Sequence, residues 1–362
     1  MMVSGLPRAS RRLSHGKLSV VHPAGWMSST IGEVCMRLVV TGGAGFIGSH
    51  FVRTLVNGGY EPFTGADVTV LDAFTYAGRE ENLDSVSDSP QLHVQRADIR
   101  DSVRVAEVLA GADVVVHFAA ETHVDRSITG AADFVTTNVV GTQVLLQAAL
   151  DLGVGRFVHV STDEVYGSID EGSWPENHPL EPNSPYSAAK AGSDLLARSY
   201  HRTHGLDVVI TRCSNNYGPY QFPEKVIPLF VTNLLDGQRV PLYGDGLNVR
   251  DWLHVDDHCH GIALAAAKGG AGEIYNIGGG TELQNRELTA RLLTAVSVGE
   301  EMIERVPDRK GHDRRYSVDW SKIHDELGYE PRRSFDDGLA ETVAWYRENR
   351  GWWEPLKSGV VR

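Results

Sequence analysis

The sequence predicts an α/β protein, with a doubly wound parallel sheet followed by a smaller, mixed α/β C-terminal lobe. Two observations support this fold class. Between residue 36 and about residue 212, short apolar runs rich in β-branched residues alternate with segments of helical spacing. Such alternation is typical of a parallel sheet covered by helices on both faces. Beyond residue 212 the chain changes to turns and short helices, so we expect a different architecture there.

Six apolar runs are the expected strands of the sheet. They cover residues 37–40, 67–71, 92–94, 113–117, 156–160 and 207–211. Helices are expected between most of them. The helices near 133–152 and 184–205 carry more apolar residues than one packed face requires. These two helices are therefore candidates for pairing with a second copy of the chain.

The chain divides into four expected regions. They are a flexible or mis-assigned extension over 1–35, a first domain over 36–212, a second lobe over 213–355 from which one strand and helix can return to the first domain, and a tail over 356–362. The extension has no apolar core followed by a cleavage site, so a secretory signal is not expected. Within the second lobe an amphipathic helix is predicted over 334–351, with Ser334 as its cap and acids at 336 and 337.

Composition excludes several classes of partner. The 362 residues are 41% hydrophobic and 22% charged, which is ordinary for a soluble globular protein. No apolar run approaches the roughly 18 residues that cross a bilayer. With 34 basic against 47 acidic residues the formal charge is −13, which argues against nucleic acid as a partner. Cys35, Cys213 and Cys259 lack metal-like spacing, so we expect no metal site and a reducing, cytoplasmic compartment.

The first expected strand runs directly into a glycine motif. Gly42, Gly45 and Gly48 stand in a Gly-x-x-Gly-x-x-Gly pattern at a strand-to-helix turn. Missing side chains let the backbone approach a pyrophosphate, and the new helix presents free N–H groups to it. Asp72 ends the second strand, where a carboxylate accepts hydrogen bonds from both ribose hydroxyls and repels a 2′-phosphate. The pattern therefore predicts a Rossmann-type domain over 36–212 that binds NAD rather than NADP.

Two later strand ends are candidates for further cofactor contacts. Asp98 and Ile99 follow the third strand and can flank the adenine. Residues 118–122 leave the fourth strand with small side chains that can lie against the cofactor. The structural alternatives are a solvated turn for the acid and tight helix–sheet packing for the small residues.

Five polar side chains after the fifth strand carry the predicted chemistry. Thr162, Asp163 and Glu164 emerge at the carboxyl end of that strand, where open α/β sheets bind their ligands. Tyr186 and Lys190 are four residues apart in an Ala-rich helix, so they share one face, and the ammonium is expected to lower the pKa of the phenol. Adjacent strand residues point to opposite faces, so both acids reach one substrate only if the chain has already left the strand. The alternative is a solvated acid pair.

Together these features resemble the extended short-chain dehydrogenase/reductase superfamily. Within it, the chain from Met36 to about Trp353 resembles the dTDP-glucose 4,6-dehydratases. The specific strings are AAETHVDRS at 119–127, STDEVYG at 161–167, SPYSAAK at 184–190, SNNYGPY at 214–220, PEK at 223–225 and DRKGH at 308–312. Two departures are Thr122, where many relatives have Ser, and Lys310, where Pro is common. Neither removes a group that the chemistry needs.

The resemblance implies a hydro-lyase of deoxysugar biosynthesis that makes dTDP-4-keto-6-deoxyglucose and water from dTDP-glucose. Tyr186 would take the C4 hydroxyl proton while NAD takes the hydride, with Lys190 holding the phenolate and Thr162 orienting the C4 oxygen. Glu164 would then remove the C5 proton and Asp163, protonated, would donate to the departing C6 hydroxyl. Opposite protonation states in neighbouring carboxyls require environments that push their pKa values apart.

The resemblance also implies a set of binding residues. For NAD they are Gly42, Gly45, Phe46, Ile47, Gly48, Asp72, Ala73, Phe74, Thr75, Asp98, Ile99, Phe118, Ala119, Ala120, Thr122, Thr137, Tyr186, Lys190 and Asn216. For the sugar nucleotide they are Thr122, Thr162, Asn215, Lys225, Val226, Pro241, Tyr243, Arg250, Asn285, Arg309 and His312. For each cation taken singly, an exposed surface charge is the alternative.

Other functions stay open at this point. A 4-epimerase or a UDP-glucuronate decarboxylase of the same superfamily shares the oxidation at C4, but neither needs the acid pair for dehydration. A catalytically silent NAD-binding protein is a further alternative, against which the complete set from Thr162 to Lys190 argues. A homodimer is implied by the family. The sequence does not separate thymidine from uridine carriers, nor cell-wall from secondary-metabolite pathways.

Overall fold

The structure, a computed structural model, describes residues 35–308 and 311–360, without the side chains of 358–360. Residues 1–34 of the expected extension (1–35) and the substrate candidate Arg309 lie outside the described residues. Residues from Cys35 onward form one unit built around a central sheet.

Seven parallel strands make up this sheet, in the order β10-β6-β5-β4-β1-β2-β3. Their bounds are Arg37–Thr41 (β1), Asp67–Asp72 (β2), Leu92–Arg96 (β3), Val114–His117 (β4), Arg156–Thr162 (β5), Val208–Cys213 (β6) and Ile274–Ile277 (β10). The strand order reverses at β1, because β2 lies on one side of it and β4 on the other. The doubly wound Rossmann-type fold is confirmed. Ligands bind such sheets where the order reverses, at the carboxyl ends of the strands.

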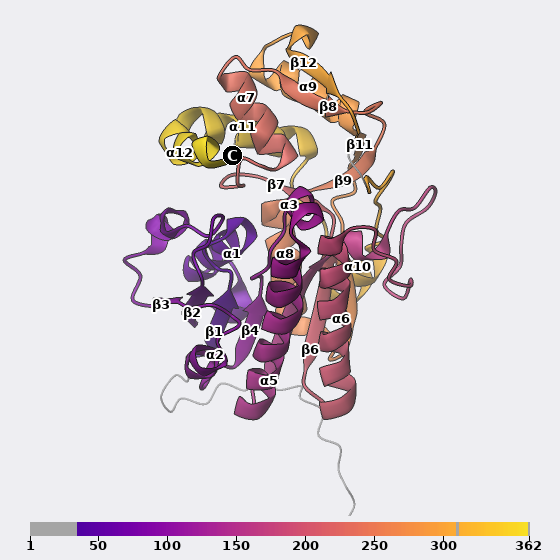
Figure 1. Cartoon of the computed structure of the whole chain (residues 1–362). Helices are drawn as coiled ribbons and strands as arrows, with labels where there is room; N and C mark the ends of the chain where they lie inside the picture. Colours follow the sequence, from indigo (N-terminus) through magenta and orange to yellow (C-terminus); the bar gives the residue numbers. More distant parts are fainter. Residues whose placement is uncertain (1–34, 309–310, 361–362) are drawn as a thin grey trace, which may run out of the picture. The chain divides into compact units, whose positions relative to one another are not determined.

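The strands are apolar on both sides because both sides are covered. Leu38 and Val40 of β1 pack with one buried cluster, while Val39 between them packs with another. Helices α1 (Phe46–Val56), α8 (Val255–Lys268) and α10 (Ser321–Leu327) contribute to the first cluster, and α2 (Ser102–Leu109), α5 (Thr142–Leu152) and α6 (Pro185–His204) to the second. Figure 1 shows α5 and α6 running side by side along the sheet.

The segment predicted as one helix over 133–152 is divided. The chain forms α3 (Val124–Thr129), α4 (Ala131–Phe134), a π-helical stretch (Val135–Gly141) and then α5. Gly141 lies so close to Ile99 that an added Cβ would stand 2.5 Å from its Cδ1. The helix therefore widens where it passes the end of β3, as π-bulges often do near functional sites.

The C-terminal lobe combines small sheets with helices, as Figure 1 shows. The sheets are β11-β9-β7 and β12-β8, from Asn215–Tyr217 (β7), Val240–Tyr243 (β8), Val249–His254 (β9), Glu282–Gln284 (β11) and Ile303–Val306 (β12). The helices are α7 (Val226–Leu235), α9 (Asn285–Val296), α11 (Phe335–Glu348) and α12 (Arg350–Val360). The predicted cap of α11 is confirmed, since Ser334 Oγ accepts a hydrogen bond from the Asp337 N–H at 3.2 Å. Among the described helices, none combines the length and apolar character needed to cross a bilayer.

Candidate active site

A cavity of about 540 Å³ opens at the carboxyl ends of the strands. Its walls come from the segments that follow β1, β2, β3, β4 and β5, and from residues 213–225 at the entrance to the C-terminal lobe. Residues expected to bind the cofactor and residues expected to act on the sugar therefore line one cavity. Its size is typical of a pocket for a small molecule or cofactor.

The glycine motif forms the narrow end of this cavity. Gly42 has φ +68°, and a Cβ there would stand 2.5 Å from the backbone nitrogen of Ala119. A Cβ at Gly48 would stand 2.2 Å from the carbonyl oxygen of Gly42. Helix α1 starts at Phe46, directly after this turn, so its free N–H groups face the space that the glycines leave. The turn fits a pyrophosphate.

Asp72 ends β2 beside the glycine turn. It is 7% exposed, its Oδ2 accepts from the Ala44 N–H at 3.0 Å and its Oδ1 from the Phe74 N–H at 2.8 Å. Burial raises the pKa of Asp72, and these two hydrogen bonds act in the opposite direction. A Cβ at Gly78 would stand 2.6 Å from Oδ1, so the sequence analysis missed a glycine that this carboxyl requires. The carboxyl both fixes the turn and lines the cavity.

The two expected catalytic acids lie on a turn rather than on the strand. β5 ends at Thr162, and residues Asp163–Tyr166 form one 3₁₀ turn. Thr162 Oγ1 accepts a hydrogen bond from the Glu164 N–H at 3.3 Å and so caps this turn. The two acids were expected to reach one substrate only if the chain has already left the strand. This condition is met, since both Asp163 and Glu164 follow the strand and line the cavity.

Asp163 has the environment of a protonated acid. It is 2% exposed, and its Oδ2 has no hydrogen-bond partner among the described residues. Burial, then the carboxylates of Glu164 and Asp251, raise the pKa of Asp163 well above its ordinary value. A neutral carboxyl at this position can donate a proton, which matches the role expected of it.

Tyr186 and Lys190 enter the cavity from the first turns of α6. Ser184 caps that helix in a capping box with Ser187, and Pro185 occupies its first position. Lys190 Nζ donates a hydrogen bond to the carbonyl oxygen of Val160 at 2.8 Å. Burial lowers the pKa of Lys190 to about 8.

One electrostatic expectation is wrong for this structure. Burial, followed by the Glu164 carboxylate, raises the pKa of Tyr186 well above its ordinary value, while a hydrogen bond with Thr162 lowers it. Lys190 is not among the largest influences on this pKa. The reason is that its ammonium points to Val160, whereas a carboxylate faces the phenol.

Comparison with known proteins agrees with this geometry. The family model of GDP-mannose 4,6 dehydratase matches residues 39–342. A dTDP-glucose 4,6-dehydratase from Streptomyces antibioticus is 66% identical over 325 residues, which is 89% of this chain and 96% of that protein. A crystal structure of the dTDP-glucose 4,6-dehydratase from Streptomyces venezuelae with NAD bound is 67% identical, with a TM-score of 0.88 over 89% of this chain and 100% of that one. The chain belongs to the dTDP-glucose 4,6-dehydratase family.

More distant relatives of this dehydratase family share the same fold. A UDP-glucose 4-epimerase structure from Thermotoga maritima is 33% identical, with a TM-score of 0.80 over 87% of this chain and 100% of that one. Fold alone therefore does not separate dehydratases from epimerases. The side chains at the end of β5 have to make that distinction.

Most of the site residues implied by the dehydratase resemblance line the cavity. They are Gly42, Gly45, Phe46, Ile47, Gly48, Asp72, Ala73, Thr75, Asp98, Ile99, Phe118, Ala119, Ala120, Thr122, Thr137, Thr162, Asp163, Glu164, Tyr186, Lys190, Asn215, Asn216 and Lys225. The sequence analysis did not select several others that line it, among them Glu121, Asp133, Cys213, Gln221, Phe222 and Glu224. Glu224 lies inside the PEK string at 223–225, and that string is the sequence signal from which it could have been selected.

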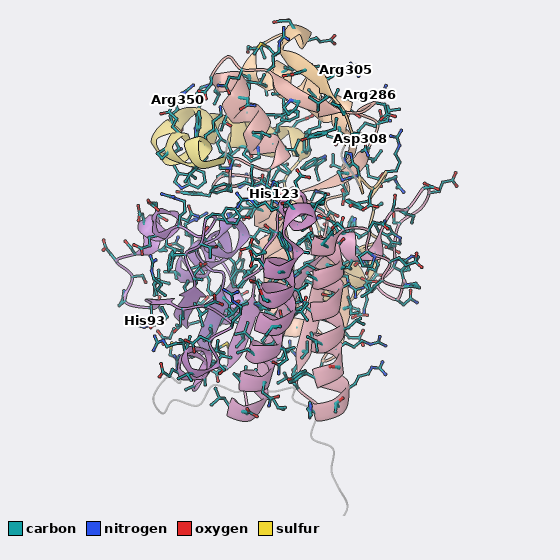
Figure 2. The ribbon with its side chains drawn as sticks, in the orientation of Figure 1. His93, His123, Arg286, Arg305, Asp308 and Arg350 are labelled. Carbon is teal, nitrogen blue, oxygen red and sulfur yellow. The ribbon has the colours of Figure 1, made fainter. Side chains whose placement is uncertain are left out.

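The remaining candidates for substrate binding lie outside the lining of this cavity. They are Val226, Pro241, Tyr243, Arg250, Asn285 and His312, and Phe74 of the cofactor set also lies outside it. Arg250 is 5% exposed, donates to the Asp313 carbonyl at 2.9 Å, and its Cζ lies 4.1 Å from the Tyr316 ring centroid. Tyr243 meets His312 edge to face at 6.4 Å. These residues belong to the C-terminal lobe, and Figure 2 shows on that lobe Asp308, whose Oδ1 lies 2.6 Å from His312 Nδ1. Burial raises the pKa of Asp163, but Arg250 is near enough to the acids to act in the opposite direction.

Proposed function

We propose that the chain is a dTDP-glucose 4,6-dehydratase, a hydro-lyase that converts dTDP-glucose to dTDP-4-keto-6-deoxyglucose and water with NAD as a bound cofactor. One observation carries the proposal. A buried, proton-retaining carboxyl (Asp163) and a second carboxyl (Glu164) share one turn and one cavity with Tyr186 and Lys190. Neighbouring carboxyls with separated pKa values are what an elimination by acid and base requires.

The residues at the narrow end of the cavity fit NAD. The glycine turn has no side chains that would exclude a pyrophosphate, and Asp72 and Lys190, which both line the cavity, would hold the two riboses. When bound, NAD supplies a hydride acceptor for oxidation at C4 and a hydride donor for reduction at C6.

The chain's own residues account for the proton transfers. Tyr186 is the proposed base that takes the proton of the C4 hydroxyl, with the Thr162 hydroxyl hydrogen-bonded to the same oxygen. Burial and the Glu164 carboxylate raise the pKa of its phenol, so the Thr162 hydroxyl and the positive charge that NAD would bring would together have to favour the phenolate. A ketone at C4 makes the C5–H bond acidic, and the carboxylate of Glu164 removes that proton. The carboxyl of Asp163 donates its proton to the C6 hydroxyl, which leaves as water. Glu164 then returns a proton to C5. At this stage Tyr186 is protonated and Asp163 is ionised, so the proton taken from O4 passes through solvent to Asp163 and both groups are restored. One proton leaves O4 and one departs with the water, so the protons balance over the cycle.

The sugar nucleotide is held by residues of the C-terminal lobe. A nucleoside diphosphate is anionic, so Lys225, Arg250 and His312, together with Arg309, are the proposed contacts for phosphates and base. Lys225 donates to the Thr122 carbonyl at 2.7 Å, which brings a cation to the boundary between the two lobes. Asn215, Val226, Pro241, Tyr243 and Asn285 complete the proposed binding set.

A homodimer is supported by an apolar surface on two neighbouring helices. Val135 is 48% exposed and Val140 46% exposed on the π-helical stretch, and Leu195 on α6 is 53% exposed. The π-helical stretch packs against α6, and in this proposal these side chains belong to one face of the pair. Two such faces would form a four-helix bundle. A cytoplasmic location is supported by the three cysteines, of which Cys35 is exposed and Cys213 and Cys259 are buried, all as free thiols.

A single incubation tests the proposed activity. Purified protein is given dTDP-glucose or UDP-glucose, and the products are separated by chromatography and weighed by mass spectrometry. The expected result is loss of one water from dTDP-glucose, with the NAD still bound to the protein. Conversion of UDP-glucose to an isomer of unchanged mass would favour the 4-epimerase instead. No change in either sugar nucleotide would favour a silent NAD-binding protein.

A further inference from the structure

Three segments of the cavity wall are joined at its rim by four side chains: Tyr76, Arg126, Phe222 and Glu224. We call this set the Tyr76 bridge. The neighbours of Tyr76 on both sides, Thr75 and Ala77, line the cavity. Arg126 lies on α3, shortly after the lining residues 118–122, while Phe222 and Glu224 line the cavity from the C-terminal side. The bridge therefore connects the loop after β2, the segment after β4 and the entrance to the C-terminal lobe.

The contacts within the bridge are close and varied. Arg126 Nη2 lies 3.0 Å from Glu224 Oε2, and its Cζ lies 3.9 Å from the centroid of the Tyr76 ring. The rings of Tyr76 and Phe222 meet edge to face with centroids 5.3 Å apart. His123 Nε2 approaches the same Glu224 oxygen at 3.8 Å, and Figure 2 shows His123 where the sheet domain meets the C-terminal lobe. One guanidinium thus contacts two of the three segments that meet here.

The charges make Arg126 the central member. The Glu224 side chain is only 4% exposed, so its carboxylate depends on the guanidinium for compensation. Arg126 also lowers the pKa of the half-buried Glu121, which burial raises. Burial, Glu224 and Glu121 together raise the pKa of Tyr76, which keeps its phenol neutral. Removing the guanidinium would leave two acids facing each other at the rim.

Two segments of the bridge begin near a residue with positive φ, a backbone conformation that residues other than glycine rarely adopt. Phe74, two residues before Tyr76, has φ +50°, and Tyr220, two residues before Phe222, has φ +67°. Such conformations persist only where the surroundings hold them. At their bases the segments are fixed by stacking, with Arg96 over the Phe74 ring at 4.5 Å and Arg53 over the Tyr220 ring at 4.3 Å. At their tips they are fixed by the bridge.

We propose that the Tyr76 bridge retains NAD in the cavity between turnovers and opens when the cofactor exchanges. This inference rests on the proposed function, in which each cycle regenerates the cofactor and gains nothing from releasing it. None of the four bridge side chains is among the proposed catalytic groups, and Tyr76 and Arg126 are outside the lining of the cavity, so in this proposal the bridge controls the residence of the cofactor and not the chemistry. Its residues act by position, through the wall segments that they hold together.

The experiment measures how fast NAD leaves the protein, without any sugar present. Holoenzyme is mixed with an excess of isotopically labelled NAD, and the label bound after rapid desalting is followed in time. In Arg126→Met we expect dissociation at least about tenfold faster than in the wild type, because a buried carboxylate has lost its partner. Tyr76→Leu should also accelerate dissociation. Its matched control Tyr76→Phe keeps the ring contacts and loses only the hydrogen bond between the phenol and Glu224, so its dissociation rate should stay closer to that of the wild type than that of Tyr76→Leu.

Each result has a defined meaning. With NAD at saturation, kcat of Arg126→Met should stay within about twofold of the wild type, because the bridge affects how long NAD stays bound and not the catalytic steps. Wild-type dissociation rates in both Arg126→Met and Tyr76→Leu would refute the proposed role of the bridge. A fall in the kcat of Arg126→Met at saturating NAD as large as its rise in dissociation rate would also refute it. Thermal melting of the cofactor-free proteins identifies a variant that fails to fold. If Arg126→Met fails to fold, the NAD dissociation rates of Tyr76→Leu and Tyr76→Phe provide the test. A wild-type protein that binds no NAD would refute the proposed function itself, which separates the two failures.

Discussion

The hydroxyl of Thr162 donates a hydrogen bond to Oδ1 of Asp163 at 3.3 Å, while Oδ2 of the same carboxyl is buried with no hydrogen-bond partner among the described residues. One oxygen is therefore oriented and the other remains available to a substrate. The strand-to-turn transition between these two residues creates the arrangement, because it turns the acid out of the sheet and into the cavity.

Replacing this carboxyl should separate the steps of the reaction. In Asp163→Asn the amide keeps the shape but has no acidic proton, so C4 oxidation should persist while loss of water slows by about 10²- to 10⁴-fold. Rapid-quench mass spectrometry would detect the accumulated 4-keto hexose before dehydration. Unchanged elimination would mean that another acid serves.

Glu164→Gln should bind both ligands and fail later in the cycle. The amide cannot take the C5 proton, so product formation should fall by about 10²- to 10⁴-fold. Isothermal titration with NAD and with the nucleoside diphosphate checks that binding is retained. Turnover at the wild-type rate would overturn the role of this residue.

Asp72→Ala should weaken NAD more than the sugar nucleotide. The substitution removes the proposed ribose contacts, the hydrogen bond from Ala44 in the glycine turn and the hydrogen bond from Phe74 in the loop after β2. We expect a loss of about 2–4 kcal/mol in NAD binding and little change for the nucleoside diphosphate. Equilibrium binding of each ligand gives the ranking, and the reverse ranking would contradict the assignment.

A buried ion pair behind Lys190 should contribute to stability in acid. Asp194 is 1% exposed and accepts from Arg212 Nε at 2.9 Å, and its pKa is lowered to about 2 although burial, the largest influence, acts to raise it. Between about pH 4 and pH 2 the unfolded chain therefore binds more protons than the native one, so stability falls as the pH falls through this window. Asp194→Asn, which leaves Arg212 unpaired, should cost roughly 3 kcal/mol at pH 7 and progressively less towards pH 2. Urea unfolding of both proteins at several pH values tests this, and a difference independent of pH would contradict it.

Leu195→Asp should dissociate the proposed dimer. A charge on this exposed apolar face would be buried without a partner in a four-helix bundle. Light scattering after gel filtration should report the mass of one chain for the variant and of two for the wild type. The same charge placed at Val103, which is 66% exposed on α2, should leave the mass unchanged.

The sequence was sufficient for the sheet and for the reacting groups because both depend on local patterns. The six predicted strands match β1 to β6 to within a few residues, and the glycine turn, the acid pair and the Tyr–Lys pair were each signalled by spacing. β10 was not located, because a four-residue strand is specified by its pairing with β6, a long-range contact. The π-helical stretch was missed for a similar reason, since the close approach of Gly141 to Ile99 is tertiary.

Side chains that reach the cavity from distant segments were the hardest to predict. Gly78 is needed only because the chain folds back onto Asp72, and Glu224 is significant only because Arg126 lies opposite. The pKa of Tyr186 was misjudged because helical spacing places Lys190 on the same face but does not show that its ammonium turns towards Val160. Sequence patterns identified the catalytic side chains, but their pKa values depend on how they pack in the folded protein.

The distribution of the thiols makes the protein convenient to label. Burial raises the pKa of Cys213 and of Cys259, so neither forms a reactive thiolate at neutral pH, whereas Cys35 is exposed. A maleimide dye would therefore attach at one position, before the first strand and outside the lining of the cavity. Fluorescence from that single tag could follow the protein during purification and assembly while every group used in turnover stays unmodified.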